Sequence, residues 1–228
     1  MRKNGKQLLL GAIALGNLVV GGNFVKVSAE GLAFTPYEVN ECSINYKTEQ
    51  KVILIDPGHG GNDSGAVNPK TGDKEAQFNM EIALNVKRRL EENGFKVILT
   101  RYYHKEFYEI YERVNMANEG DYMFFLSIHN NASETHKGNG TETYYNWEGA
   151  TKDIAKRISK KVANNIDTTD RGAFLTPYFT KRINKPSVLV ECEFIDNEKG
   201  LEKVKNKQDE ISIGIVEGLL EGFEANGL

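Results

Sequence analysis

The amino-acid sequence predicts a single α/β domain whose parallel sheet is covered by helices. Short, β-branched apolar runs alternate with helical patterns from Lys51 to the end of the 228-residue chain. The runs are almost continuously apolar, which is typical of strands buried on both faces of a sheet. Because strands and helices alternate along the whole segment, we expect one α/β domain.

Four strands and four helices account for this alternation. Strands are expected in the four apolar segments KVILI (51–55), KVILT (96–100), YMFFLSI (122–128) and SVLVE (187–191). Helices are expected where apolar residues recur every three or four positions, over 76–93, 107–118, 152–166 and 209–223. Gly94 follows the first of these helices and provides a C-terminal stop.

The composition is typical of a globular protein and excludes several other classes. With 39% hydrophobic and 27% charged residues, the sequence is typical of a globular domain and not of a disordered chain or a bundle of membrane spans. The formal net charge of -3 gives no indication of a nucleic-acid partner. Two cysteines are too few for a disulfide scaffold or for a zinc site of the Cys₄ or Cys₂His₂ kind.

The N-terminus has the three-part pattern of a secretory signal peptide. Three cations fall within residues 1–6, an apolar run covers 8–20, and Val27-Ser28-Ala29 offers small residues to signal peptidase. The alternative is an uncleaved membrane anchor, but the apolar run is shorter than the roughly 20 residues that cross a bilayer.

These observations divide the chain into three parts. We predict a signal peptide at 1–29, an N-terminal tether at 30–50 and the globular α/β domain at 51–228. The tether is assigned because 30–49 shows little periodicity. The mature protein is therefore expected to work outside the cytoplasm.

Residues with metal-binding and acid–base chemistry gather at one predicted edge of the sheet. His59 and His129 follow the first and third strands, Glu191 ends the fourth, and Glu75 begins the first long helix. Ligands of open α/β sheets bind beyond the carboxyl ends of the strands. Two imidazoles and one carboxylate are a common catalytic zinc set, and a further glutamate can act as general base.

Each of these residues also has an ordinary structural interpretation. His59 could be a turn residue between glycines, His129 a hydrogen-bonded strand end, and Glu75 a carboxylate favoured by the helix dipole. Glu191 is harder to explain in this way, because a carboxylate at the end of a buried strand is costly unless it is paired or bound to metal. The convergence of all four on one edge favours a zinc site.

A series of sequence blocks resembles the zinc-dependent N-acetylmuramoyl-L-alanine amidases of the amidase 3 type. In order, the blocks are ILIDPGHGGNDSGA from residue 53, EAQFNM from 75, TR at 100, ERVNMAN from 112, SIHNNAS from 127 and PSVLVECEFIDN from 186. The resemblance implies zinc ligands at His59, Glu75 and His129, and a catalytic glutamate at Glu191. It also implies a twisted sheet flanked by helices on both faces, as in the phosphorylase/hydrolase-like fold.

The same resemblance implies a substrate and a reaction. The substrate is peptidoglycan, and the bond cleaved joins the lactyl group of N-acetylmuramic acid to L-alanine of the stem peptide. We expect a monomer, and the sequence leaves open whether an accessory or activator protein is needed. The physiological role implied is cell-wall or spore-cortex remodelling or lysis.

One position departs from the family pattern, because Glu193 stands where the family usually has glycine. Residues two apart on a strand share a face. Glu193 could therefore crowd the cleft, raise the pKa of Glu191 or compete with it as base. Glu191 remains the predicted base.

Several further residues keep two interpretations. Asp56, Asn130 and Asn131 suit either hydrogen bonds to metal ligands and substrate or plain turn chemistry. Three aromatic residues also have two interpretations, namely Tyr144, Tyr145 and Trp147. They form either a platform for a sugar or an aromatic cluster that is buried or lies at the rim.

The remaining polar and sulfur-containing residues are assigned more ordinary roles. Arg101 and Arg113 are expected in structural ion pairs, and His104 and His136 in solvent. Cys42 and Cys192 could pair in an oxidising compartment, but one adjoins a buried strand and the other lies in the tether.

Two alternative functions fit parts of the same pattern. A secreted zinc exopeptidase of the carboxypeptidase kind would use the same metal set, but it should need an arginine or another cation to bind a chain terminus. A catalytically inactive wall-binding module would be favoured by loss of His59, Glu75, His129 or Glu191, and all four are present.

Overall fold

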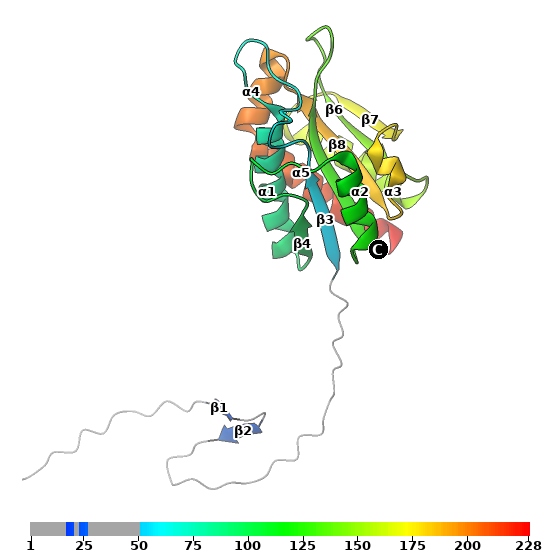
Figure 1. Cartoon of the computed structure of the whole chain (residues 1–228). Coiled ribbons are helices and arrows are strands. Elements are labelled where there is room, and N and C mark those ends of the chain that lie inside the picture. Colours follow the sequence, from blue (N-terminus) through cyan, green and yellow to red (C-terminus); the bar gives the residue numbers. More distant parts are fainter. Residues whose placement is uncertain (1–16, 21–22, 27–50) are drawn as a thin grey trace, which may run out of the picture. The chain divides into compact units, whose positions relative to one another are not determined.

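The computed structural model describes residues 17–20, 23–26 and 51–228 (Figure 1). Strands β1 (Asn17–Val20) and β2 (Asn23–Lys26) pair antiparallel in a unit separate from Glu49–Leu228. Apart from these two strands, the signal peptide at 1–29 and the tether at 30–50 lie outside the described residues, and both stay predictions. In the part of the chain that the structure describes, no helix has both the length and the apolar character needed to cross a membrane.

A six-stranded sheet with the order β4-β3-β5-β8-β6-β7 forms the centre of the domain. Its strands are β3 (Val52–Pro57), β4 (Lys96–Leu99), β5 (Phe124–Asn131), β6 (Thr141–Tyr145), β7 (Asp170–Leu175) and β8 (Ser187–Phe194). The first four in this order are parallel to one another. β6 runs antiparallel to β8, and β7 runs parallel to β6. The predicted α/β domain with a mostly parallel sheet is confirmed.

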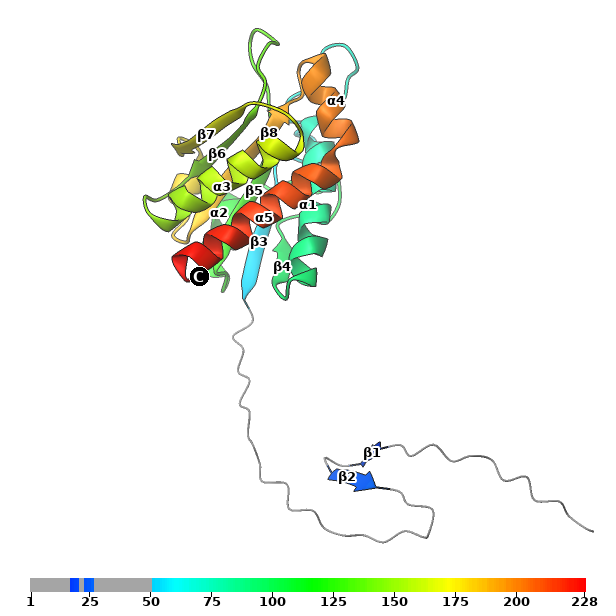
Figure 2. The same ribbon diagram turned by 180° about the vertical axis from the view of Figure 1, so that it is seen from behind.

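Helices cover both faces of this sheet. On one face lie α1 (Glu75–Glu92), α3 (Ala150–Asn165) and α5 (Gln208–Asn226), as Figure 2 shows. On the other face lie α2 (Ile110–Glu119) and the short 3-10 helix η1 (Phe179–Arg182), with α2 in front of the sheet in Figure 1. Helix α4 (Glu198–Asn206) follows β8.

The apolar strands are buried on both faces because successive side chains point in opposite directions. Ile53 and Ile55 belong to the larger core, which packs against α1, α3 and α5. Leu54, between them, belongs to a smaller core with Val114 of α2 and Phe125 of β5. The continuous apolar runs in the sequence are therefore explained by two cores on opposite sides of the sheet.

Several elements were not predicted from the sequence, namely β6, β7, η1 and α4. β6 reads TETYY and β7 reads DRGAFL, so neither has the continuous apolar run of a central strand. β7 is an edge strand whose residues are exposed or half-buried. Strands of this kind are specified by pairing with neighbours rather than by their own sequence.

The strand ends also differ from the prediction in a way that affects the site. β5 continues to Asn131, so His129 lies within the strand and not after it, and β8 continues to Phe194, so Glu191 is not its last residue. The two strands stay paired to their ends, with one irregularity between His129 and Asn131. Backbone pairing therefore fixes the spacing between His129 and Glu191, which are partners in register.

Candidate metal centre and active-site pocket

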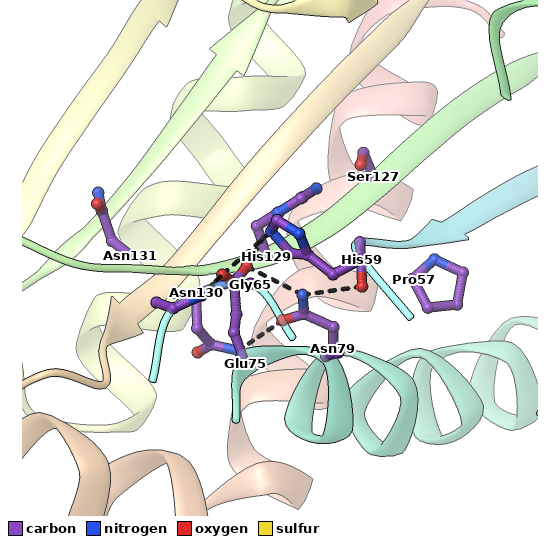
Figure 3. Close-up of polar contacts among 12 residues, drawn as sticks. Pro57, His59, Gly65, Glu75, Asn79, Ser127, His129, Asn130 and Asn131 are labelled. Atoms are coloured by element: carbon purple, nitrogen blue, oxygen red, sulfur yellow. Dashed lines mark hydrogen bonds and ion pairs between the residues drawn. The ribbon is translucent and has the colours of Figure 1, made fainter. Parts of the chain in front are cut away.

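Three potential metal ligands come together at the carboxyl ends of β3 and β5. His59 lies in the loop after β3, Glu75 is the first residue of α1, and His129 lies near the end of β5. One ligand atom from each residue lies within 4.8 Å of the others. Figure 3 shows the two imidazole rings beside each other with the Glu75 carboxylate next to them.

The Glu75 carboxylate bridges the two histidines. Its Oε2 lies 3.1 Å from His59 Nε2, and its Oε1 lies 3.0 Å from His129 Nδ1. Burial alone would raise the pKa of Glu75, but the two imidazoles hold that pKa far below its usual value. Burial alone would lower the pKa of His59, but the carboxylates of Glu75 and Asp63 raise it to about 9. The carboxylate and the His59 imidazole therefore favour each other's charged forms.

Neighbouring groups hold the three side chains in place. Asp63 Oδ2 lies 2.8 Å from His59 Nδ1, the ring nitrogen that does not face Glu75. Asn79, one turn after Glu75 in α1, donates to Glu75 Oε1 at 3.0 Å. The backbone N–H of Asn130 donates to the same oxygen, and the N–H of Ala66 donates to Oε2. Sequence reasoning missed the roles of Asp63 and Asn79, although the spacing of four residues from Glu75 to Asn79 was a usable signal.

Two glycines make room for this cluster. A Cβ atom at Gly58 would lie 2.2 Å from the His129 ring. At Gly65, which has a φ of +62°, a Cβ atom would lie 2.5 Å from Glu75 Oε2 and 2.6 Å from the His59 ring. Only glycine at both positions lets the backbone approach the ligands so closely.

Glu191 faces the same cavity from the neighbouring strand. This cavity has a volume of about 420 Å³, and its lining includes His59, Glu75, His129 and Glu191. The Glu191 carboxylate is buried, and its Oε2 has no hydrogen-bond partner. Burial, followed by the negative charges of Glu75 and Glu142, raises the pKa of Glu191 well above its usual value.

Glu142 was not identified from the sequence, yet it contributes to the raised pKa of Glu191. It lies on β6 as the register partner of Glu191. Asn131 donates to its Oε1 at 2.8 Å, and Arg171 forms an ion pair with its Oε2. Nothing in the sequence indicated that Glu142 lies beside Glu191, because β6 itself was not predicted.

Glu193 does not have the effects on Glu191 that its position in the sequence allowed. Its side chain is fully buried and does not line the cavity that holds Glu191. Its Oε1 accepts the N–H groups of Gly140 at 2.7 Å and Phe194 at 2.9 Å. Its other oxygen accepts the hydroxyl of Thr168. Glu193 is thus fully hydrogen-bonded, and the carboxylate that raises the pKa of Glu191 from across the sheet is Glu142.

Asp56 and Arg113 form a buried ion pair beneath the His59 loop. Arg113 Nη1 lies 2.7 Å from Asp56 Oδ1, and Arg113 Nη2 donates to the His59 carbonyl at 2.8 Å. Thr100 and Ser127 also donate to Asp56. Burial alone would raise the pKa of Asp56, but Arg113 and these hydroxyls lower it below its usual value. The ion pair predicted for Arg113 is confirmed. Asp56 lies within β3 and not in a turn, and its hydrogen bonds join Arg113, Thr100 and Ser127.

Arg101 differs from the prediction of an ion pair. Its guanidinium is buried and donates to the carbonyls of Pro57, Gly58 and Ala76 at 2.9–3.0 Å. These carbonyls belong to the end of β3, the following loop and the first turn of α1, and one planar donor group contacts all three. Arg101 therefore supports the metal-site loop through backbone contacts.

The two asparagines after His129 connect the metal site to its surroundings. The Asn130 side chain donates to Asn79 at 2.9 Å, and the Asn131 side chain donates to Glu142. The Asn130 side chain therefore contacts Asn79, which in turn donates to Glu75. Asn131 lines the cavity and lies between the metal site and β6.

The other residues singled out in the sequence lie in different places. Tyr145 is buried in the larger core, whereas Trp147 is 43% exposed and lies outside the cavity. Tyr144 is half-buried beside Tyr178 and Phe174. These positions exclude a common platform of Tyr144, Tyr145 and Trp147.

The remaining histidines and cysteines are away from the metal site. His104 is exposed, and His136 is largely exposed but lies 3.0 Å from Asp196. Cys192 is fully buried, and burial raises the pKa of its thiol. Cys42 lies outside the described residues, so the pairing with Cys192 stays a question for experiment.

Comparison with known proteins shows which family shares these features. Residues 53–221 match the family described as N-acetylmuramoyl-L-alanine amidase. The chain is 35% identical over 205 residues to the N-acetylmuramoyl-L-alanine amidase LytC of Bacillus subtilis, covering 88% of this chain but only 39% of LytC. It is 31% identical to the germination-specific N-acetylmuramoyl-L-alanine amidase of the same organism, covering 78% of this chain and 81% of that protein.

A solved structure shares the fold over most of the domain. This is the CwlD amidase from Clostridioides difficile in complex with the GerS lipoprotein, which is 30% identical to this chain. The TM-score is 0.72, and the match covers 77% of this chain and all of the other. The arrangement of sheet and helices described above is therefore that of an amidase catalytic domain.

Proposed function

The chain belongs to the family of N-acetylmuramoyl-L-alanine amidases of the amidase 3 type, and we propose that it hydrolyses the muramoyl–L-alanine amide of peptidoglycan with a zinc ion held by His59, Glu75 and His129. The observation that carries this proposal is the meeting of three ligands and one unpaired carboxylate, Glu191, at a single cavity. The chain spans 39% of the length of LytC, so its substrate and activity are inferred for this domain by itself.

The donor set fits zinc. Two imidazoles and one carboxylate leave a fourth position open, as in catalytic zinc sites. His129 Nε2 is buried without a hydrogen-bond partner, and the carboxylate between the rings holds its charge because its pKa is lowered. Asp63 against His59 is the kind of outer contact that orients a ligating imidazole. Zinc bound there would supply Lewis-acid polarisation of the scissile carbonyl and activation of water.

Glu191 is the proposed general base and acid. Its side chain lines the cavity, and within the part of the chain that the structure describes its Oε2 has no hydrogen-bond donor, so an oxygen of this carboxylate can accept the proton of the attacking water. The same oxygen then returns the proton to the leaving amine of L-alanine. A carboxylate with a raised pKa suits both steps, because its affinity for the proton is closer to that of its reaction partners.

The lining of the cavity favours an amidase over an exopeptidase. An exopeptidase of the carboxypeptidase kind needs a free cation to bind the terminal carboxylate of its substrate. Among the residues that the structure describes, Arg113 is the one lysine or arginine that lines the cavity. It is already engaged by Asp56 and by backbone carbonyls, so it is not available to a substrate.

The setting of the enzyme follows from its substrate. Peptidoglycan lies outside the cytoplasmic membrane, and the predicted signal peptide at 1–29 supports export to the cell wall or spore cortex. The relative in complex with the GerS lipoprotein supports an accessory protein for this chain also. We propose that the catalytic chain itself is monomeric and has no nucleic-acid partner.

Digestion of purified peptidoglycan tests the proposal. The purified chain, with one equivalent of zinc, should release peptides with a free N-terminal L-alanine and leave glycan strands without stem peptides. Mass analysis of both products identifies the bond, and a chelator should abolish the release. Trimming of peptide ends without loss of peptide from the glycan would instead identify an exopeptidase. Binding to the wall without any cleavage, and without zinc in the protein, would identify an inactive module.

A further inference from the structure

Three aromatic side chains beside the cavity have no part in the metal site. They are Tyr178, Tyr144 and Phe174, and we call them the aromatic ledge. The Tyr144 ring lies between the other two, 4.9 Å from Tyr178 at an interplanar angle of 81° and 5.8 Å from Phe174 at 39°. Tyr178 lines the cavity, whereas Phe174 lies on the outermost strand, β7. The ledge therefore leads from the cavity toward the edge of the sheet.

The backbone register places this ledge on the same face of the sheet as the catalytic groups. Tyr144 is the register partner of Leu189 on one side and of Phe174 on the other. Leu189 and Glu191 are two residues apart on β8, and both line the cavity. Residues that are partners, or two apart on one strand, share a face. The ledge is thus a continuation of the cavity surface across β6 and β7.

Two of the three side chains of the ledge are much more exposed to solvent than the neighbouring aromatic residue of the core. Tyr178 is 43% exposed and Phe174 is 44% exposed. Tyr145, on the opposite face of the same strand, is 4% exposed and belongs to the core. Large apolar rings grouped in the open beside a catalytic cavity are typical of a binding surface.

Fixed polar groups border the ledge. Tyr144 Oη donates to Glu142 Oε1 at 2.7 Å, and Asn131 donates to the same oxygen at 2.8 Å. Arg171 forms an ion pair with the other oxygen of Glu142. The surface therefore combines aromatic rings with a carboxylate, an amide and a guanidinium, all held in place before any ligand binds.

This combination matches the chemistry of a sugar. A pyranose ring has apolar C–H groups on its faces and hydroxyl or acetamido groups around its rim. Aromatic rings contact the apolar faces, while side-chain carboxylates and amides form hydrogen bonds with the rim.

We propose that the aromatic ledge binds the glycan strand of the substrate, so that sugars flanking the cleaved muramoyl residue lie on Tyr178, Tyr144 and Phe174. The inference rests on the proposed function, because the substrate there is a glycan that carries peptides. It adds a glycan subsite and predicts that the enzyme distinguishes substrates by the length of the sugar chain.

Binding of a peptide-free glycan tests the ledge without catalysis. The probe is a tetrasaccharide of alternating N-acetylglucosamine and N-acetylmuramic acid, titrated into the full chain by calorimetry. Phe174→Ala and Tyr178→Ala should each weaken binding by about 3- to 10-fold, as expected for loss of one aromatic contact. Tyr178→Phe keeps the ring and should retain most of the affinity. Trp147→Ala is the matched control, because Trp147 is also 43% exposed but is not one of the three rings of the aromatic ledge.

Hydrolysis of two substrates gives a second, independent measurement. The substrates carry the same stem peptide on one sugar or on four sugars. Wild-type kcat/KM should be higher for the longer glycan, and Phe174→Ala should remove most of that difference. An equal loss on both substrates would show that Phe174 does not contact the additional sugars and would overturn the inference.

The two measurements separate the inference from the proposed function. If the wild-type chain cleaves neither substrate but binds the tetrasaccharide through the ledge, the amidase proposal fails and the glycan subsite stands. If it cleaves both substrates but does not bind the tetrasaccharide, the glycan subsite is wrong and the amidase proposal stands.

Discussion

Two buried carboxylates border the same cavity and have opposite properties. Asp56, on β3, accepts hydrogen bonds from Thr100 at 2.6 Å, Arg113 at 2.7 Å and Ser127 at 2.9 Å. Glu191, on β8, has one oxygen without a partner. The pKa of Asp56 is lowered by its donors despite burial, whereas the pKa of Glu191 is raised by burial and by neighbouring carboxylates. Burial by itself therefore does not identify a catalytic acid or base.

Glu193 makes the comparison sharper, because it shares a strand with Glu191. It is more deeply buried than Glu191, but it accepts three hydrogen bonds from the protein. A fully hydrogen-bonded carboxylate stabilises the fold and has no free lone pair directed at a substrate. The unpaired oxygen distinguishes Glu191 from the two structural carboxylates, and it is what a proton acceptor requires.

The largest effect is expected for Glu191→Gln. The amide has the same shape but cannot take up the proton, so kcat should fall by about 10²- to 10⁴-fold. The activity is measured as the release from peptidoglycan of peptides with a free N-terminal L-alanine. Elemental analysis should find zinc still bound to the variant. Glu193→Gln is the matched control on the same strand and should keep kcat within about twofold. Wild-type turnover in Glu191→Gln would assign proton transfer to another group.

The next largest effect is a loss of stability in Arg113→Met. This substitution leaves the Asp56 carboxylate buried without its cation, at a cost of about 3–5 kcal/mol in the free energy of unfolding. Urea unfolding monitored by circular dichroism measures the loss. The double variant Arg113→Met/Asp56→Asn should recover part of it, because the uncompensated charge is removed. An unchanged unfolding midpoint in the single variant would show that the pair does not stabilise the fold.

A smaller loss of stability is expected for Glu193→Ala. The substitution leaves the N–H groups of Gly140 and Phe194 and the hydroxyl of Thr168 without their acceptor. Unsatisfied buried donors of this kind cost about 1–3 kcal/mol. The metal content and the kcat of the folded protein should stay near wild type, and a loss of activity at full zinc occupancy would return Glu193 to the active site.

The smallest effect is a difference in the pH dependence of stability, measured on the metal-free protein. The lowered pKa of Asp56 means that its contribution is present above about pH 4, the usual pKa of an unfolded aspartate, and is lost as pH falls through the folded pKa. The raised pKa of Glu191 has the opposite sign, because ionisation of the buried group penalises the folded state above about pH 4.3.

Two variants separate these contributions. Glu191→Gln should raise the unfolding midpoint at neutral pH and have little effect near pH 4. Asp56→Asn should lower the midpoint at neutral pH, with an effect that fades in acid. Thermal unfolding at a series of pH values measures both. The same pH trend in the two variants would contradict the contrast between the two carboxylates.

Most of the sheet and most of the candidate site follow from the sequence. The four apolar runs predicted β3, β4, β5 and β8, and the helical periodicity predicted α1, α2, α3 and α5. His59, Glu75 and His129 were expected at one edge because parallel strands end on the same side, and the structure brings them together. β6 and β7 were missed because their sequences lack a strong pattern, and Glu142 and Phe174 were missed with them. Tyr144 was singled out, but with Tyr145 and Trp147 and not with Tyr178 and Phe174.

The sequence by itself determined the domain class and the chemical groups at the sheet edge, since hydrophobic periodicity and strand endings are local properties of the chain. Only the tertiary structure decided which carboxylates are paired. The donors to Asp56 include Arg113, 57 positions away, and those to Glu193 include Gly140, 53 positions away. Hydrogen-bond partners at such separations are brought together by packing and strand pairing, so no local pattern could distinguish Glu191 from Glu193.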